Sequence, residues 1–598
     1  MKPLFDWLDQ RTGYRHITRE ALFENIPGGS RWRYVWGSTL SFTLIIQFIT
    51  GIALWMAYSP SSQTAWESVY YIQNEMWGGW LLRGIHHFTA QAMNVLLVLH
   101  LMQVVIDGAY KAPREVNFWF GVLLLLLVLG LSLTGYLLPW DQKGFWATKV
   151  ATNIAGITPI IGPSLQKLII GGSDYGHHTI TRFFALHAGV LPASIILLLV
   201  GHIYLFRRHG ITAKEPLKKP DAAFWPDQVL KDAVACLAVL AAILFFVIRS
   251  HGADLGAPAD PSEPYSAARP EWYFLFLFQF LKYFPGGTEI WGAIIIPSLL
   301  IGIIFLMPFF GKWKLGHRFN LGLLWSLLAG VALLTYFAIA EDRRNPDYVR
   351  SVKDAKESAR RVKELAHSST GIPVTGAVTL LRNDPLTQGP KIFAKHCATC
   401  HRYDGHDGMG IVSTNAPEAP DLKGFASREW ITGFLDPEKI SGPHYFGGTK
   451  FKEGKMAKFV KTDIARFTAE EKKQLEKVVI ALSAEASLKS QRELDKRDES
   501  IIKEGRSLIA SATMQCTDCH QFQKEDELAD SVDLTGYGSH QWLNGIIENP
   551  KHPKFYGKKN DRMPAYGEDK ILNAHSIDLL VKWLRGEWID PEIESEAK

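Results

Sequence analysis

Cysteine is scarce in this sequence, with five residues among 598. Four of them stand in two Cys-x-x-Cys pairs, which leaves Cys236 alone and excludes a framework of disulfides. Charge of either sign is also in little excess, because 65 Lys and Arg face 60 Asp and Glu, for a net charge of +5. This small excess is spread through the chain and indicates no nucleic-acid partner. A hydrophobic fraction of 47% excludes a disordered chain.

Charged residues are missing from seven long apolar stretches. These stretches are 34–57, 84–106, 116–140, 183–206, 233–248, 290–311 and 319–340. Their lengths suit helices that cross a bilayer, whereas residues 341–598 are charged and polar. The contrast excludes a uniform soluble enzyme and predicts seven membrane-spanning helices followed by an extramembrane part.

Basic residues in the loops predict the orientation of these spans. With the N-terminus inside, the inner segments hold more than twice as many Lys and Arg as the outer loops, although the outer loops are longer in total. We therefore expect a multi-pass protein of the bacterial inner membrane with a cytoplasmic N-terminus. Seven spans then place everything after residue 340 on the periplasmic side.

Histidine is costly inside a membrane and is usually functional there. The second stretch holds His86 and His100, fourteen positions apart, and the fourth holds His187 and His202, fifteen positions apart. An interval of fourteen positions returns a helix to nearly the same face about 21 Å along its axis. Pairing across the two helices predicts an outer site, His86 with His187, and an inner site, His100 with His202. Two histidines and no open position are typical of electron-transferring haem, here haem b, and His87 is a competing ligand that breaks the spacing.

Glycines repeat with the same spacing in the first and third stretches. They are Gly37 and Gly51, then Gly121 and Gly135. Glycine lets a bulky group approach the backbone, so these positions predict haem contacts, with plain helix packing as the alternative. Arg83 and Arg182 stand just beyond the outer histidines, where we expect them to pair with haem propionates or to anchor the membrane edge.

Each Cys-x-x-Cys pair is followed directly by a histidine. The two motifs are Cys397, Cys400, His401 and Cys516, Cys519, His520. This pattern is the attachment signal of c-type haem, in which the cysteines form thioethers and the histidine binds iron. A zinc or redox Cys-x-x-Cys is the alternative. Covalent haem on the outer side agrees with the predicted orientation.

Methionines later in each module are the candidates for the sixth iron ligand. Met563 stands well after the second motif and precedes an expected helix at 577–584, an order that resembles small class I cytochromes c. Met456 has a comparable place after the first motif, with Met409 and His444 as alternatives. Methionine ligation tends to raise the potential of a haem, which suits the end of an electron-transfer chain.

These observations predict an all-α fold, a seven-span helical bundle followed by two small α-helical cytochrome c domains. The expected segments are a four-helix dihaem core (1–210), a region of three further spans (211–340), a linker (341–385), a first haem c module (386–485), a linker helix (486–500) and a second module (501–598).

Several motifs of the membrane part resemble cytochrome b of quinol-oxidising bc complexes over about residues 30–340. They are Gly84-Ile85-His86-His87 with His100, Lys111-Ala112-Pro113-Arg114-Glu115, Leu133-Thr134-Gly135-Tyr136, Leu138-Pro139-Trp140-Asp141-Gln142, Thr181-Arg182-Phe183-Phe184-Ala185-Leu186-His187, and Pro270-Glu271-Trp272-Tyr273. In that family the last tetrapeptide marks the outer site of quinol oxidation.

The resemblance implies roles for particular residues. Pro270, Glu271, Trp272 and Tyr273 would form the outer quinol site, where Glu271 accepts a proton, with loop capping as the alternative for this carboxylate. Lys231 and Asp232 look like the inner quinone-site pair of the respiratory branch, or they simply begin a helix. The wider spacing in the fourth stretch and the absence of an eighth span look instead like the photosynthetic b–f branch, although Val35 stands where that branch carries a cysteine for an extra inner haem.

The resemblance also implies the core subunit of a quinol–cytochrome c reductase, with two haem b, two haem c and quinol as substrate. A separate Rieske iron–sulfur protein is implied, because no Cys/His pairs remain to bind its cluster. The membrane quinone pool, an acceptor such as cytochrome c or a terminal oxidase, a homodimer and outward proton translocation are further expectations. The alternatives are a quinol-linked b/c electron conduit without a Rieske partner, and a haem-based sensor or assembly scaffold.

Overall fold

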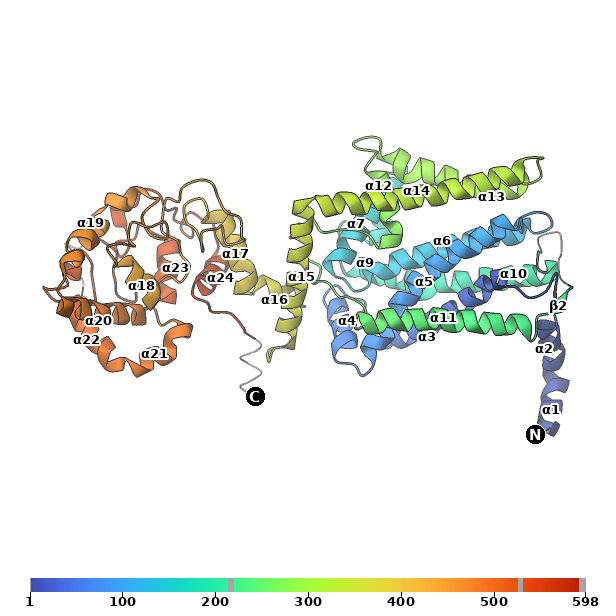
Figure 1. Ribbon diagram of the computed structural model, residues 1–598, viewed down its shortest axis with the longest axis horizontal. Helices are drawn as coiled ribbons and strands as arrows, with labels where there is room; N and C mark the ends of the chain where they lie inside the picture. The colour runs from blue at the N-terminus through green and yellow to red at the C-terminus, as the bar shows by residue number, and fades with distance from the viewer. Residues whose placement is uncertain (1, 213–219, 525–530, 591–598) are drawn as a thin grey trace. The chain divides into compact units, whose positions relative to one another are not determined.

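The computed structural model describes residues 2–212, 220–524 and 531–590, and it is built almost entirely of helices (Figure 1). The strands in these residues are the two-residue β1 (Asn25–Ile26) and β2 (Ala222–Ala223). This confirms the predicted all-α class. The chain divides into two compact units, Met1–Lys363 with Ile372–Val378, and Glu364–Gly371 with Thr379–Lys598.

Seven helical segments of the first unit are long and apolar enough to cross a membrane, which confirms the predicted spans. They are α3 (Trp36–Trp55), α5 (Gly79–Ile106), α6 (Glu115–Leu137), α9 (His177–Ala185) continued by η2 (Leu186–Val190) and α10 (Leu191–His209), α11 (Asp227–Arg249), η4 (Trp291–Ile295) with α13 (Ile296–Phe310), and α14 (Gly316–Arg344). Most begin or end outside the apolar stretches, because a helix continues into polar turns that the membrane does not cover. Within this bundle α3 packs against α5, and α6 packs against α10.

Shorter helices lie before the first span and between the spans. They are α1 (Lys2–Thr12), α2 (Tyr14–Leu22), α4 (Ala65–Asn74), α7 (Gln142–Gly156), α8 (Gly162–Ile170) and α12 (Leu275–Leu281), while α15 (Pro346–His367) follows the last span.

Loops that we expect on one side of the membrane contact one another. On the inner side β1 pairs antiparallel with β2, and Arg33 forms an ion pair with Asp107. On the outer side the Trp66 indole donates to the carbonyl of Gly256 at 2.8 Å. This grouping fits spans that alternate in direction through the bundle.

The second unit is a small helical body. Its helices are α16 (Val378–Arg382), α17 (Pro385–His396), α18 (Arg428–Phe434), α19 (Lys455–Thr462), α20 (Ala469–Glu485), α21 (Arg492–Arg497), α22 (Glu499–Ile509), α23 (His540–Glu548) and α24 (Ala574–Leu584). The sequence predicts two successive modules, but α17 packs on α24 and α20 packs on α22, so the helices pair across the expected boundary. Residues 591–598, assigned to the second module, lie outside the described residues.

Candidate haem and quinol sites

The outer histidine pair lies between α5 and the fourth span. The rings of His86 and His187 are 6.3 Å apart between centroids, with an angle of 73° between their planes. Two metal–imidazole bonds of about 2 Å each fit within this separation with one metal atom between the rings. The two residues that the histidine spacings selected therefore meet.

Threonine hydroxyls fix the tautomer of this outer pair. Thr50 Oγ1 donates to the carbonyl of Ile46 at 2.6 Å and lies 2.9 Å from His86 Nδ1. Because its one proton is already donated, the hydroxyl accepts from Nδ1–H, which leaves Nε2 with a free lone pair. Thr134 repeats the arrangement, donating to the carbonyl of Gly130 at 2.9 Å and lying 3.2 Å from His187 Nδ1. Both rings are thus oriented as metal ligands.

The inner pair has a similar but less symmetric environment. His202 Nδ1 lies 3.0 Å from the carbonyl of Asn117, an oxygen that only accepts, so Nε2 again keeps its lone pair. Within the described part of the chain, the buried His100 Nδ1 has no hydrogen-bond partner.

The paired glycines stand against three of the four rings. A Cβ atom on Gly135 would lie 2.6 Å from His187 Cε1, and one on Gly51 would lie 3.3 Å from His86 Cε1. On the inner side, a Cβ on Gly121 would lie 3.4 Å from His202 Cε1, while one on Gly37 would meet nothing within 4 Å. At the outer pair, these close approaches, the free Nε2 lone pairs and the ring separation fit a bis-histidine haem. At the inner pair, the close approach of Gly121 and the Nε2 lone pair of His202 fit a haem ligand at His202.

The two arginines beside the outer pair donate to backbone carbonyls. Arg83 donates to the carbonyls of Ala253 at 2.6 Å and Asp254 at 2.7 Å, and to Gln73 Oε1 at 2.8 Å. Arg182 donates to the carbonyl of Leu168. In the structure they fasten the outer loops, and their expected pairing with haem propionates stays a prediction.

Both Cys-x-x-Cys-His motifs lie in the second unit with their histidines oriented alike. His401 Nδ1 lies 2.8 Å from the carbonyl of Pro420, and His520 Nδ1 lies 2.7 Å from the carbonyl of Val532. Burial lowers the pKa of His401, which favours the neutral imidazole that binds metals. Burial raises the pKa of the Cys397 thiol to about 12 and that of Cys516 to about 11.

One cavity of about 600 Å³ serves both motifs. It is lined by all four cysteines and both histidines of the motifs, and by Met456 and Met563. The rival ligands Met409 and His444 are not among the described lining residues, and 43% of Met409 is exposed. The mostly apolar walls and these donors fit covalently attached haem, and they favour Met456 over its two rivals.

The Pro270–Tyr273 segment is fastened to the bundle at its glutamate. Glu271 Oε1 accepts from Lys143 Nζ at 3.0 Å, and the Glu271 side chain is only 15% exposed. Lys143 belongs to α7, so two outer loops distant in sequence supply this ion pair.

The neighbouring aromatic residues connect this segment to the second span. Trp272 Nε1 donates to Gln91 Oε1 at 3.1 Å, and Gln91 Nε2 lies 2.7 Å from His87 Nε2. His87 therefore belongs to the network of the Pro270–Tyr273 segment, whereas His86 faces His187. Burial raises the pKa of Tyr273, so its phenol stays neutral near neutral pH.

Lys231 and Asp232 lie near the start of α11, where Lys231 contacts the residues before the first span and Asp232 contacts the first span itself. Lys231 Nζ donates to Ser30 Oγ at 2.7 Å. The buried Asp232 accepts from Ser38 Oγ at 2.6 Å and from Gln228 Nε2 at 2.8 Å. Lys231 and Asp232 therefore have different hydrogen-bond partners.

Sequence reasoning overlooked Thr50, Thr134 and Lys143. The threonines directly precede Gly51 and Gly135, so a repeated Thr-Gly pair was a signal available in the sequence. Lys143 had no such signal, because its partner Glu271 is 128 residues away.

Known families match three segments of the chain. The family described as cytochrome b/b6/petB matches residues 25–210, and cytochrome b(C-terminal)/b6/petD matches residues 258–348. The family described as cytochrome c matches residues 386–477.

Individual relatives match the membrane part. Cytochrome b of Rhodobacter capsulatus is 34% identical over 314 residues, which cover 50% of this chain and 71% of the relative. The menaquinol:cytochrome c reductase cytochrome b subunit of Geobacillus thermodenitrificans is 40% identical over 220 residues, covering 36% of this chain and 98% of the relative. Cytochrome b6 of Synechococcus elongatus is 36% identical over 212 residues, covering 36% and 99%. A solved hyperthermophilic respiratory Complex III chain aligns with a TM-score of 0.49 and 26% identity, over 59% of this chain and 95% of that one.

Proposed function

The chain belongs to the cytochrome b family and carries a cytochrome c region after it, and from this premise we propose that it is the fused cytochrome b and dihaem cytochrome c subunit of a quinol–cytochrome c reductase. The observation that carries the proposal is the outer histidine pair, with its 6.3 Å ring separation and threonine-fixed tautomers. The relative named as a menaquinol:cytochrome c reductase subunit supports the same reaction class.

Four histidines of the spans and two of the Cys-x-x-Cys-His motifs would hold the cofactors. His86 with His187 and His100 with His202 would bind two haem b, and the four cysteines would attach two haem c. When bound, these groups supply reversible one-electron transfer. The Thr50 and Thr134 hydroxyls keep the outer ligands in the metal-binding tautomer.

Quinol is oxidised at the outer side in this proposal, which releases two electrons and two protons. Glu271 accepts a proton there, and the neutral Tyr273 phenol offers a hydrogen bond beside it. Pro270 and Trp272 shape the same segment. Quinone is reduced at an inner site near Lys231 and Asp232, which takes protons from the cytoplasm, so that protons move outward.

The second electron of each quinol needs a separate acceptor. No Cys/His pairs remain in the sequence for an iron–sulfur cluster, so a Rieske protein is proposed as a partner chain. The haem c unit then passes electrons to an outer acceptor such as cytochrome c or a terminal oxidase. A homodimer in the inner membrane, with the N-terminus cytoplasmic and the haem c unit periplasmic, completes the proposal.

Glu271→Gln tests this function in the complex purified from native membranes. We expect quinol-dependent cytochrome c reduction to fall by about 100-fold or more, the scale of general acid–base catalysis. The exposed Glu289 is in the same outer loop, so Glu289→Gln is the matched control and should keep its activity. The wild-type complex should contain equal amounts of haem b and haem c and a co-purifying Rieske protein. A haem ratio far from one, or full activity in Glu271→Gln, would contradict the proposal.

A further inference from the structure

The two haem c motifs are followed by the same short pattern. It reads Asp421-Leu422-Lys423-Gly424-Phe425-Ala426-Ser427-Arg428-Glu429-Trp430 in the first copy and Asp533-Leu534-Thr535-Gly536-Tyr537-Gly538-Ser539-His540-Gln541-Trp542 in the second. In each copy the serine caps a helix by accepting from the tryptophan amide, and the tryptophan indole donates to the aspartate carbonyl. The second unit therefore contains two copies of one structural module.

Equivalent positions of the two copies touch each other. The rings of Phe425 and Tyr537 are 5.3 Å apart between centroids. Ala426 and Gly538 both have positive φ, of 61° and 73°, and a Cβ on Gly538 would lie 2.2 Å from Ala426 Cβ. Contact between equivalent residues is the arrangement found at a twofold axis. The copies thus cross at this point.

Beyond the crossing, each copy packs against the first helix of the other. Helix α17, which precedes Cys397, lies so close to α24 that a Cβ on Gly389 would be 2.2 Å from Trp583 Cβ. Helix α22, which precedes the second motif, lies so close to α20 that a Cβ on Gly505 would be 2.1 Å from the carbonyl oxygen of Lys477. The first helix of each copy is exchanged.

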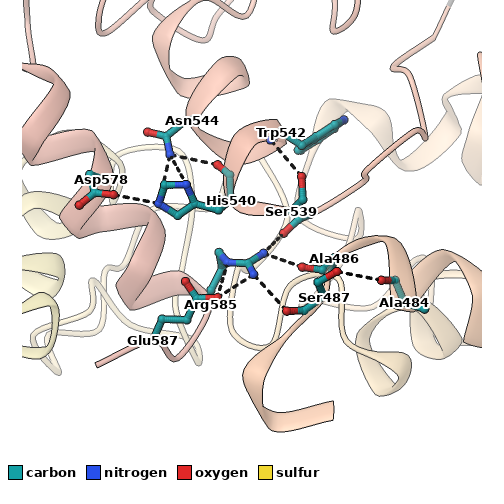
Figure 2. Close-up of polar contacts among 11 residues, drawn as sticks. Ala484, Ala486, Ser487, Ser539, His540, Trp542, Asn544, Asp578, Arg585 and Glu587 are labelled. Carbon is teal, nitrogen blue, oxygen red and sulfur yellow. Dashed lines mark hydrogen bonds and ion pairs between the residues drawn. The ribbon is translucent and has the colours of Figure 1, made fainter. Parts of the chain in front are cut away.

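A buried arginine fastens the exchanged parts together. Arg585, just after α24, donates to the carbonyls of Ala486 at 2.8 Å and Gly538 at 2.5 Å (Figure 2). Ala486 directly follows α20 of the first copy. The Arg585 side chain therefore links the end of α24, the end of α20 and the loop at Gly538, where the two copies touch.

Because of this exchange of helices, each methionine lies near the haem c motif of the other copy. Met563 packs against the same hydrophobic cluster as Cys397 and Ala398 of the first motif, and the Tyr566 hydroxyl donates to the carbonyl of His396 at 2.5 Å. Met563 thus belongs to the surroundings of the first motif, although it lies in the second copy.

Met456 has the reciprocal position. It packs against the same buried cluster as Phe467 and Leu475, and these two residues also pack against the cluster that Cys516 of the second motif contacts. The sequence pairs each methionine with the motif of its own module, and the packing differs because each module completes its core with the other copy.

We propose that the two haem c groups have crossed axial ligands, His401 with Met563 and His520 with Met456. This inference rests on the proposed attachment of haem to both motifs. One wall of each haem site then comes from the other copy, so neither module is complete alone.

Spectroelectrochemistry of the full-length protein tests the crossing. Cys397→Ser leaves the first haem attached through Cys400 alone, and the unreduced vinyl group shifts its α band and marks it. In this background we expect Met563→His to lower the midpoint potential of the marked haem only, because methionine ligation raises the potential. Met456→His should lower that of the unmarked haem only. Met409→His, at an exposed methionine, is the matched control and should change neither.

The outcomes separate the crossing from the function on which it rests. Effects on the opposite haems, or on neither haem, overturn the crossed ligation. Absence of covalent haem in the parent protein would instead overturn the proposed function.

Cleavage of the intact chain gives an independent measurement. A sequence-specific protease site inserted between Lys496 and Arg497 should leave the fragment with the second haem on the membrane, because the copies interlock. The same site at the exposed Val374 is the control and should release both haems together. Release of the second haem alone after cleavage at 496 overturns the exchange.

Discussion

At the scale of single residues, the proposed outer haem site contains two hydroxyl groups beside its two imidazoles. Thr50 and Thr134 each give their proton to a carbonyl of the preceding turn, so they can only accept from the histidine. Accepting the Nδ1 proton orients the ring and makes Nε2 more basic toward a metal. Each threonine before a paired glycine therefore accepts the Nδ1 proton of one histidine and so leaves its Nε2 free for a metal.

Thr50→Val removes the acceptor for His86 Nδ1 while keeping the size of the side chain. We expect the outer haem b to bind about 10- to 100-fold more weakly, the usual effect of losing such a partner. Its midpoint potential should rise, because a less basic ligand stabilises the ferric form less. Potentiometric titration of the haem b bands measures both effects.

Two variants on the same helix control this measurement. Thr50→Ser keeps the hydroxyl and should behave like the wild type. Thr43→Val removes a buried hydroxyl that bonds only the carbonyl of Leu40 among the contacts found for it, and it should leave the outer haem unchanged. Equal effects of Thr43→Val and Thr50→Val would refute the role of Thr50.

At the scale of elements, a π-helical turn explains the unequal spacing of the two histidine pairs. His86 and His100 are fourteen positions apart in the continuous helix α5, whereas His187 and His202 are fifteen positions apart. His187 lies in η2, where the wider i→i+5 turn accommodates one additional residue. The extra residue is absorbed, so that His187 faces His86 of α5 while His202 lies against Gly121 of α6.

Gly135→Ala tests the fit between α6 and the fourth span. A Cβ at this position would lie 2.6 Å from His187 Cε1, so the ring must move and the outer site should lose its haem. Gly130→Ala in the same helix is the control, since its Cβ would make an ordinary contact of 3.8 Å with Leu191 Cδ1. Pyridine haemochrome analysis should find half of the haem b lost in the first variant and none in the second. Full haem b content in Gly135→Ala would count against this packing.

At the scale of the whole molecule, the odd number of spans determines on which side of the membrane we expect the second unit. Seven spans place the two ends of the membrane part on opposite sides. The basic loops predict that the haem c unit lies outside, on the side of the proposed quinol-oxidation site. An eighth span would return it to the cytoplasm, away from its electron donor.

The protease site at Val374 also measures this orientation. In right-side-out spheroplasts, added protease should release a fragment that carries both haem c groups, because the segment before the second unit is exposed to the outside. In inverted vesicles the same treatment should release nothing. Release from inverted vesicles only would reverse the orientation.

The sequence by itself determined the number of spans, the histidines of the two pairs and the two haem-attachment motifs. These features are written in local patterns, in apolar runs, regular histidine spacings and short motifs, whose physical consequences depend little on distant residues. Only the tertiary structure decided which distant groups meet, such as Lys143 with Glu271 and the threonines with their histidines. It also decided that the haem c modules exchange helices, because two copies of one module offer nearly the same contacts within a copy as between copies. Which of the two pairings forms depends on the contact between Ala426 and Gly538 and on the hydrogen bonds of Arg585, and no local sequence pattern reveals these contacts.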